Sequence, residues 1–445
     1  MKVFDELSDE ELEQHLARAE TAFKKQRLTS FEQRAAWMRQ AAALLHSEQE
    51  TVARLMTLEM GKTVRSARAE VAKCAQGCRY YAEHAEALLA DEPADAGAVG
   101  AADAFARYQP LGVVLAIMPW NFPLWQVVRF AAPALMAGNV GLLKHASNVP
   151  RTALYLSELY ERAGFPEGSF QALLIGSSRV ERVLRDRRVA GVTLTGSGPA
   201  GAAVAALAGE MIKPSILELG GNDAFVVMPS ADLEAAATVA TTARCQNNGQ
   251  SCIAAKRFIV HEAVADEFER RFVEKMTALV VGDPLDETTD VGPLATSAGR
   301  DDIEELVTDA VAKGAKVLCG GERLASPGWY YPPTVITGLT PEMRLYTEES
   351  FGPVAGLFRV GNIDEAIALA NATDFGLGAN AWTNDDDERQ HFVRDLEAGA
   401  VFINGMVTSY PELPFGGVKT SGYGRELSAP GIRAFCNLKT VWVGP

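Results

Sequence analysis

The chain has 445 residues, of which 48% are hydrophobic and 22% are charged, and its formal net charge is −15. A single hydrophobic core stops growing at roughly 250 to 300 residues, so we expect at least two domains. The acidic balance argues against a nucleic-acid-binding surface, and no apolar run reaches the roughly 20 residues that a membrane span needs, so neither nucleic acid nor membrane is expected as a partner.

The N-terminal segment MKVFDELSDEELEQHLARAE is acidic and lacks the apolar stretch of a signal peptide, which favours a cytoplasmic location. The six cysteines are sparse and form no C-x-x-C pair, as expected of thiols that stay reduced. Cys74 and Cys78 are four residues apart on a helical stretch. We interpret them as core residues rather than as metal ligands, and we predict no metal site.

The first part of the chain has apolar residues at helical spacing from residue 8 to about residue 91, with Gly61 as a helix stop. The segment FARYQPLGVVLAIMPWNFP then predicts a hairpin around residues 110–112 that leads into a buried strand. From there strands and helices alternate, which predicts a parallel, doubly wound sheet. The predicted strands cover residues 113–118, 140–144, 170–175, 190–195 and 215–219, and the predicted helices cover residues 124–137, 150–163, 179–185 and 199–210.

A second alternating series runs from NDAFVVM to GANAWT and predicts a second α/β domain. It includes a helix at 231–246, a strand in KRFIVHE and a helix at 264–279. No long linker separates the two series, so we expect closely packed domains with the active site between them. The closing segment FCNLKTVWVGP is predicted as a strand, and because an exposed terminal strand needs a cover, we expect a homo-oligomer.

Three residues are candidates for chemistry. Cys252 follows the tight turn at residues 248–249 and is a candidate nucleophile, with an inert buried cysteine as the alternative. Glu218 ends an apolar strand, where shielding from water would raise its pKa and suit a general base; a salt-bridged acid is the alternative. Asn121 lies in a proline-flanked turn, as either an oxyanion donor or a residue that caps its own turn.

The segment GSGPAG at 196–201 matches the dinucleotide-binding pattern G-x-G-x-x-G, which would assign Glu218 to a ribose. The surrounding motifs indicate otherwise. Over essentially its whole length the chain resembles the aldehyde dehydrogenase superfamily, through PWNFP, LLKHASNVP, VTLTGSGPAG, LELGGNDAFVV, NNGQSC, EESFGPV and PFGGVKTSGYGREL in the family's order.

The resemblance implies an α/β aldehyde dehydrogenase-like fold with a Rossmann-like cofactor domain, a second α/β catalytic domain and a small oligomerisation hairpin and strand. The implied bounds are 1–91, 111–218 and 403–435 for the cofactor-binding domain, 219–402 for the catalytic domain, and 92–110 and 436–445 for the oligomerisation segment. We expect a homodimer or a homotetramer.

The resemblance also implies covalent oxidation of an aldehyde to a carboxylic acid. Cys252 matches the nucleophile that forms a thiohemiacetal and then a thioester, and Glu218 matches the base that activates water to hydrolyse it. The Asn121 amide and the backbone N–H of Cys252 match the oxyanion donors. Glu426 matches an acid that is often placed in a proton relay, although Phe130 stands where its usual lysine partner is expected.

A nicotinamide cofactor is implied as well. In the family a Gly-Ser-x-x-x-Gly motif meets the phosphate at a helix N-terminus. Ser147 stands where a glutamate would repel a 2′-phosphate, so we predict that NADP is used at least as well as NAD; the alternative is dual specificity with a slight preference. The implied cofactor residues are Trp120, Lys144, Ser147, Thr195, Gly196, Ser197, Gly201, Leu219, Glu349 and Phe351.

Within the superfamily the chain is most similar to the compact bacterial succinate-semialdehyde dehydrogenases. An acid-aldehyde needs a cation in its pocket, for which an arginine fork is well suited. The implied substrate residues are Arg129, Arg244, Ser409 and Phe415, with a surface arginine as the alternative for Arg129. Two residues differ from those of close relatives. Gln246 stands where some succinate-semialdehyde dehydrogenases carry a second arginine, and Glu412 stands where close relatives tend to carry a basic residue. The alternatives for the whole chain are a broad-range enzyme for neutral aldehydes and a catalytically silent member of the fold.

Overall fold

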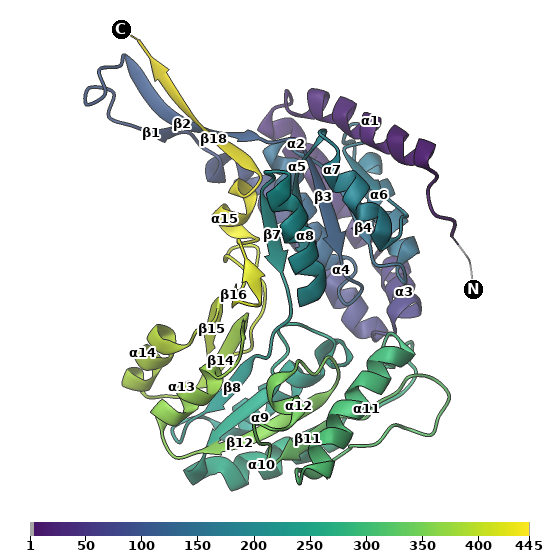
Figure 1. Cartoon of the computed structure of the whole chain (residues 1–445), viewed down its shortest axis with the longest axis vertical. Helices are drawn as coiled ribbons and strands as arrows, with labels where there is room; N and C mark the ends of the chain where they lie inside the picture. Colours follow the sequence, from purple (N-terminus) through teal and green to yellow (C-terminus); the bar gives the residue numbers. More distant parts are fainter. Residues whose placement is uncertain (1–3, 445) are drawn as a thin grey trace.

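The computed structural model describes residues 4–444. Its first sheet follows the order β17-β7-β6-β3-β4-β5, in which β3 to β7 run parallel and β17 is antiparallel to β7. Figure 1 shows β7, β3 and β4 of this sheet. This arrangement confirms the predicted parallel sheet. The strands are β3 (Val113–Met118), β4 (Val140–His145), β5 (Phe170–Ala172), β6 (Val189–Thr195), β7 (Ser215–Glu218) and β17 (Gly422–Tyr423).

Helices cover both faces of this sheet, as a doubly wound fold requires. One face packs against α2 (Phe31–Ser47), α3 (Gln49–Met60), α4 (Val64–Leu88), α5 (Trp125–Ala137) and α6 (Pro150–Arg162). The other face packs against α1 (Asp9–Gln26), α7 (Val180–Arg185) and α8 (Gly198–Glu210). Helix α3 ends at Gly61, as predicted, because this residue adopts φ +82°, which favours glycine.

The second sheet follows the order β10-β11-β12-β9-β8-β14-β15 and is parallel except for β10. Its strands are β8 (Ala224–Val227), β9 (Arg257–His261), β10 (Lys316–Cys319), β11 (Thr334–Thr337), β12 (Val354–Val360), β14 (Gly378–Trp382) and β15 (Ala400–Ile403). Helices α9 (Leu233–Cys245) and α10 (Glu262–Thr277) cover one face. The other face is covered by α11 (Ser297–Ala312), α12 (Arg344–Thr347), α13 (Ile363–Asn371) and α14 (Asp386–Asp395).

A third, antiparallel sheet forms an arm that projects from the body and carries the C-terminal strand (Figure 1). It consists of β1 (Glu92–Pro93), β2 (Asp103–Pro110) and β18 (Cys436–Val443). The chain between β15 and the arm forms β16 (Val418–Lys419) and the helix α15 (Ser428–Arg433), and β16 pairs with the short strand β13 (Phe375–Gly376), which precedes β14. The predicted terminal strand is thus confirmed, whereas the bounds of the domains stay a prediction.

The predicted hairpin around residues 110–112 is wrong. Strand β2 pairs with β1 and β18, while β3 pairs with β4 and β6 in a different sheet. The two strands also differ in burial, since most residues of β2 are only half-buried and β3 is buried along almost its whole length. Gly112, at φ +144°, redirects the chain from one sheet to the other.

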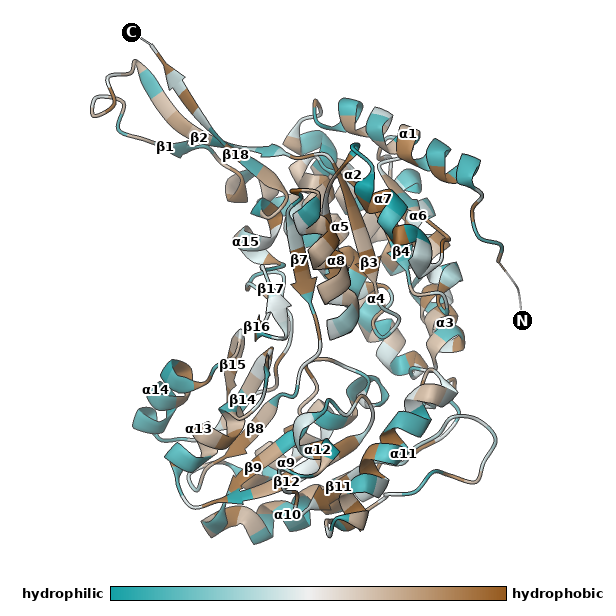
Figure 2. Cartoon of the chain, viewed as in Figure 1, coloured by the Kyte–Doolittle hydropathy of each residue, from teal (hydrophilic) through white to brown (hydrophobic). Residues whose placement is uncertain are grey.

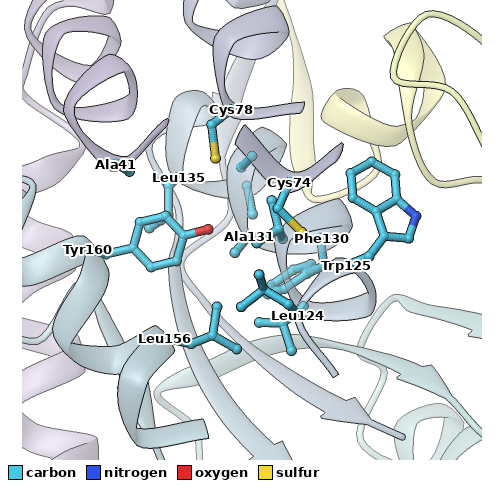
Figure 3. Close-up of a cluster of buried hydrophobic side chains, with 14 of the residues drawn as sticks. Ala41, Cys74, Cys78, Leu124, Trp125, Phe130, Ala131, Leu135, Leu156 and Tyr160 are labelled. Carbon is cyan, nitrogen blue, oxygen red and sulfur yellow. The ribbon is translucent and has the colours of Figure 1, made fainter. Parts of the chain in front are cut away.

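Apolar residues concentrate along the central strands and on the inward faces of the helices. Figure 2 shows hydrophobic residues along β3 and β7 and hydrophilic residues on outer helices such as α14. Cys74 and Cys78 lie in the core between α4 and α5, among residues such as Leu135 and Tyr160 (Figure 3). Burial raises the pKa of the Cys78 thiol to about 12, as expected for an inert core cysteine. No helix within residues 4–444 is long and apolar enough to cross a membrane.

Glu70 of α4 forms a buried ion pair and also binds the start of α5. Lys62 and Glu70 form a salt bridge, and both side chains are almost fully buried. The backbone N–H groups of Leu124 and Trp125 also donate to Glu70 Oε1, each over 2.9 Å. Because α5 has no capping side chain of its own, Glu70 satisfies its first N–H groups and fixes the turn that holds Asn121.

We expect Lys62→Met to lower the free energy of unfolding by roughly 3 to 5 kcal/mol, because Glu70 would keep a buried charge without its counter-ion. Urea unfolding followed by circular dichroism measures this change. The matched control is Lys24→Met, since Lys24 pairs with Glu20 on the surface and such pairs contribute roughly 0 to 1 kcal/mol. Equal losses in the two variants would contradict the role of the buried pair.

Candidate active site

Cys252 follows a short left-handed turn. Helix α9 ends at Cys245, and Asn247, Asn248 and Gly249 then adopt φ values of +54°, +58° and +75°. A Cβ on Gly249 would lie 2.4 Å from the carbonyl carbon of Gly352, so only glycine fits there. The turn predicted before the cysteine is therefore present, and it packs tightly against the neighbouring loop.

The two asparagine side chains of this turn bind backbone from several parts of the chain. Asn247 Nδ2 donates to the carbonyl oxygen of Asn121 over 2.7 Å and to that of Gln250 over 3.0 Å. Asn248 Nδ2 donates to the carbonyl oxygens of Gly61 and Pro293, each over 2.9 Å. These bonds connect the cysteine loop of the second sheet to the turn after β3 in the first sheet.

Cys252 lies between two cavities and lines both. The first has a volume of about 180 Å³ and is lined by helices α4 and α5 and by the loop around Ser409. The second has a volume of about 230 Å³ and lies at the carboxyl ends of β3, β6 and β7. A thiol in this position can be reached from both sides, as a nucleophile between two reactants must be.

Asn121 lines the second cavity together with Cys252 and is buried. Its Nδ2 donates one hydrogen bond, to the carbonyl oxygen of Gln250 over 3.2 Å. An amide nitrogen carries two hydrogens, so the second one is left to donate beside Cys252. The structure thus places the Asn121 amide in the same cavity as Cys252, where the sequence predicted a preorganised donor.

The charge state of Cys252 depends on its surroundings. Burial raises the pKa of the Cys252 thiol to about 12, and the positive charges of Lys256 and Arg129 oppose this rise. Lys256 Nζ also donates to the carbonyl oxygen of Cys252 over 2.6 Å and pairs with Glu349 over 3.2 Å. The sequence analysis did not identify Lys256. Its position, four residues after the cysteine and directly before the buried strand β9, could have indicated a role beside Cys252.

Glu218 and Glu426 lie close enough to influence each other, and both are buried. Burial, with the nearby Glu426 charge, raises the pKa of Glu218 well above its usual value, while Arg129 opposes the rise. Both carboxylate oxygens of Glu218 lack a hydrogen-bond partner among the described residues. The side chain lies against Gly416, whose missing Cβ leaves it room, and it lines neither cavity. Its role as a general base stays a prediction that requires rotation toward Cys252.

Glu426 has a cationic partner other than the expected lysine. It forms a buried ion pair with Arg129, one residue before Phe130, and accepts a long hydrogen bond of 3.5 Å from Thr193. Burial raises the pKa of Glu426, and Arg129 opposes that rise. Arg129 therefore supplies the positive charge that Phe130 cannot.

The second cavity contains most of the predicted cofactor residues: Trp120, Thr195, Gly196, Ser197, Leu219, Glu349 and Phe351. It reaches the N-terminus of α8, where Ser197 is the N-cap residue and makes no side-chain capping bond. The space beside Gly198 is open. Uncapped N–H groups at a helix N-terminus suit a phosphate, so these residues fit a dinucleotide.

The remaining predicted cofactor residues lie outside this cavity. A Cβ on Gly201 would lie 2.6 Å from Leu219 Cδ2, so Gly201 allows α8 to pack closely on β7. Lys144 is the penultimate residue of β4 and is half-buried, and burial lowers the pKa of its amine. Ser147 is exposed in the turn that follows. Lys144 and Ser147 share the carboxyl edge of the sheet with Thr195, because β4, β3 and β6 are parallel neighbours.

Three predicted substrate residues line the first cavity: Arg129, Ser409 and Phe415. The Arg129 guanidinium lies 4.6 Å from the centre of the Phe415 ring, and its Nη2 donates to Thr195 Oγ1 over 3.3 Å. Arg129 is almost fully buried, so the surface-arginine alternative is wrong.

Arg244 does not line either cavity, contrary to the prediction. It lies in the last turn of α9, fully buried, and its Nη2 donates to the carbonyl oxygen of Gly249 over 2.6 Å. Its position on the helix directs the side chain toward the turn at residues 247–249, and its hydrogen bond to Gly249 stabilises the loop that carries Cys252. Gln246 lines the cavity instead.

Lys73 was not predicted, yet it lines the first cavity from α4. It comes from a helix more than 40 residues before Asn121, and nothing in its local sequence distinguishes it from a solvent-exposed lysine. Only the packing of α4 against α5 brings it to this cavity.

Comparisons with known proteins give a consistent result. A sequence model described as the aldehyde dehydrogenase family matches residues 2–441. The chain is 66% identical to a succinate-semialdehyde dehydrogenase (NADP+) of Mycobacterium avium (strain 104) over 445 residues, which are 100% of this chain and 94% of that protein. It is 64% identical over 443 residues to succinate-semialdehyde dehydrogenase (NADP+) 1 of Mycobacterium tuberculosis (strain ATCC 25618 / H37Rv), covering 100% and 97% of the two chains. The crystal structure of succinic semialdehyde dehydrogenase from Streptococcus pyogenes in complex with NADP+ superposes with a TM-score of 0.97 at 38% identity, covering 100% of this chain and 97% of that one.

Proposed function

The chain belongs to the aldehyde dehydrogenase family, and from this premise we propose that it oxidises succinate semialdehyde to succinate with NADP+ as the electron acceptor. Full-length relatives at 64% and 66% identity carry this activity in their names. The observation that carries the proposal is the position of Cys252 between a cavity of predicted cofactor residues and a cavity that holds cationic side chains. Neither a binding protein nor a structural protein needs a thiol there.

The first chemical step belongs to Cys252. Its thiol gives its proton to solvent water, and the thiolate sulfur adds to the aldehyde carbon, so that a C–S bond forms and the electron pair of the C=O π bond moves to the carbonyl oxygen. The Asn121 amide and the backbone N–H of Cys252 stabilise this oxyanion. Lys256 and Arg129 favour the thiolate, because their positive charges oppose the effect of burial on the thiol pKa. When bound, NADP+ supplies the acceptor for the hydride of the adduct, which leaves a thioester on Cys252.

The second step returns the thiol. Glu218 takes a proton from water, the water oxygen attacks the thioester carbon, and the C–S bond breaks. The Cys252 thiolate takes the proton back from Glu218, and the new carboxylic acid gives its own proton to solvent to become succinate. The raised pKa of Glu218 suits this task, because a carboxylate with a higher pKa is a stronger base near neutral pH. Glu218 also argues against an enzyme that transfers the acyl group to coenzyme A. Such an enzyme must avoid hydrolysis of its thioester, whereas a base that activates water promotes it.

The preference for NADP+ is supported by the carboxyl edge of β4. Lys144 is the cation of that edge, and Ser147 offers a hydroxyl in the exposed turn after it. The 2′-phosphate of NADP+ would meet no carboxylate at residue 147. Lys144, three residues earlier in the chain, can pair with this phosphate.

We further propose that the protein is a homodimer or homotetramer in the cytoplasm. Leu438, Trp442 and Val443 on the projecting strand β18 are large apolar residues with about half of their surface exposed. A second chain would bury them and cover the edge of the arm.

We expect Cys252→Ala to reduce NADPH formation from succinate semialdehyde by roughly a thousandfold or more, since the covalent step is lost. Absorbance of NADPH at saturating cofactor measures the rate. Cys245→Ala is the matched control, because this buried cysteine faces Met276 rather than a cavity, and it should retain the activity. Turnover by Cys252→Ala at the wild-type rate would refute the proposed mechanism, and a wild type that shows no preference for succinate semialdehyde over butanal would refute the substrate.

We expect Ser147→Glu to lower kcat/KM for NADP+ relative to NAD+ by roughly tenfold or more, because a carboxylate would face the 2′-phosphate. Ser147→Gln has the same size without the charge and should keep most of the NADP+ preference. The ratio of kcat/KM for the two cofactors checks this expectation in all three proteins. A wild type that already prefers NAD+ would contradict the cofactor proposal.

A further inference from the structure

The charges around the first cavity are unevenly balanced. Two cations line it, Lys73 and Arg129, together with one acid, Glu70. Arg129 is paired with Glu426, and Glu70 is paired with Lys62. Within residues 4–444, Lys73 has no carboxylate partner, so it is the unpaired positive charge of the cavity.

The Lys73 ammonium is held in a defined position. Its Nζ donates to Ser409 Oγ over 3.0 Å and lies 4.6 Å from the centre of a Trp125 ring. Trp125 is fixed in turn, since its backbone N–H donates to Glu70 and its indole N–H donates to Ser409 Oγ over 2.9 Å. Lysine, tryptophan and serine therefore form one cluster on the cavity wall, which we call the Lys73 cluster.

Ser409 completes the donor set of this cluster. Its oxygen already accepts two hydrogen bonds, from Lys73 and Trp125. A hydroxyl has one hydrogen to donate, and no described residue accepts the hydrogen of Ser409. The buried serine and the two remaining ammonium hydrogens of Lys73 together suit an anionic acceptor with two oxygens.

We propose that Lys73 is the specificity residue that binds the carboxylate of the substrate, with the Ser409 hydroxyl as the second donor. The inference rests on the proposed function, because it names the group that recognises the acid end of the aldehyde. The acidic aldehyde gains a charge-assisted hydrogen bond from Lys73 that a neutral aldehyde of the same length cannot make. Arg129, whose charge Glu426 already balances, contributes less of the attraction.

The titration of Lys73 gives a second readout. Burial lowers the pKa of the Lys73 amine to about 8, with Arg129 acting in the same direction and Cys74 and Glu70 opposing it. Trp125 and Ser409 carry no charge. Lys73 is therefore positive below pH 8 and loses its charge above it, so the preference for the acid aldehyde should fall as the pH rises through this value. Titration of Cys252 affects both substrates equally and cancels from their ratio.

The test compares succinate semialdehyde with butanal, which has four carbons and no carboxylate. In Lys73→Met the ratio of kcat/KM for the two aldehydes should fall by roughly tenfold to a hundredfold, mainly through a higher KM for the acid. Lys73→Arg keeps the charge and should retain most of the ratio. In wild type the ratio should decline above pH 8, whereas in Lys73→Arg it should stay level to higher pH.

The outcomes separate this inference from the proposed function. A wild type without preference for the acid overturns the proposed function. A wild type with that preference, together with a Lys73→Met variant that keeps it, overturns the role of Lys73 alone. If Lys73→Met does not fold, the wild-type pH profile decides, since a ratio that stays constant from pH 7 to 10 also overturns the role of Lys73.

Discussion

The left-handed turn at residues 247–249 is the constraint on which the site depends. It forces the chain out of α9 at a position where only glycine fits against Gly352, and its asparagine side chains bind backbone near Asn121 and Gly61. Cys252 belongs to the second sheet and Asn121 to the first, so their alignment requires a connection across the two sheets. The positive φ values of Asn247 and Asn248 cost free energy, and the hydrogen bonds and close packing around the turn offset that cost.

Buried charges are distributed so that each performs a separate task. Lys62 and Glu70 satisfy one another and fix the start of α5. Arg129 and Glu426 form a second pair beside Glu218, whose pKa is raised by burial and by the neighbouring acid. Lys73 is left without an acidic partner in the described chain, where the substrate's own carboxylate can supply one. Lys73 is thus left free for recognition, whereas Arg129, the other cation that lines the first cavity, is paired with Glu426.

The sequence predicted the first parallel sheet and the second α/β domain well, because long apolar strands alternating with helices leave few other arrangements. It also indicated Cys252, Asn121 and most of the residues that line the second cavity, since their motifs are short and contiguous. It failed at residues 110–112, where a glycine that joins two sheets looks like a hairpin turn. Arg244 was misplaced because helical phase decides which way a side chain points. Lys73 was missed because its function arises only from the packing of α4 on α5.

The most direct test of the covalent mechanism is mass spectrometry of a Glu218→Gln variant quenched in acid after mixing with NADP+ and succinate semialdehyde. This variant can complete the hydride step but lacks the base for hydrolysis. A succinyl adduct on the peptide that contains Cys252, formed together with about one equivalent of NADPH, is the predicted result. Unmodified Cys252 alongside NADPH release, or an adduct on another cysteine, would contradict the account.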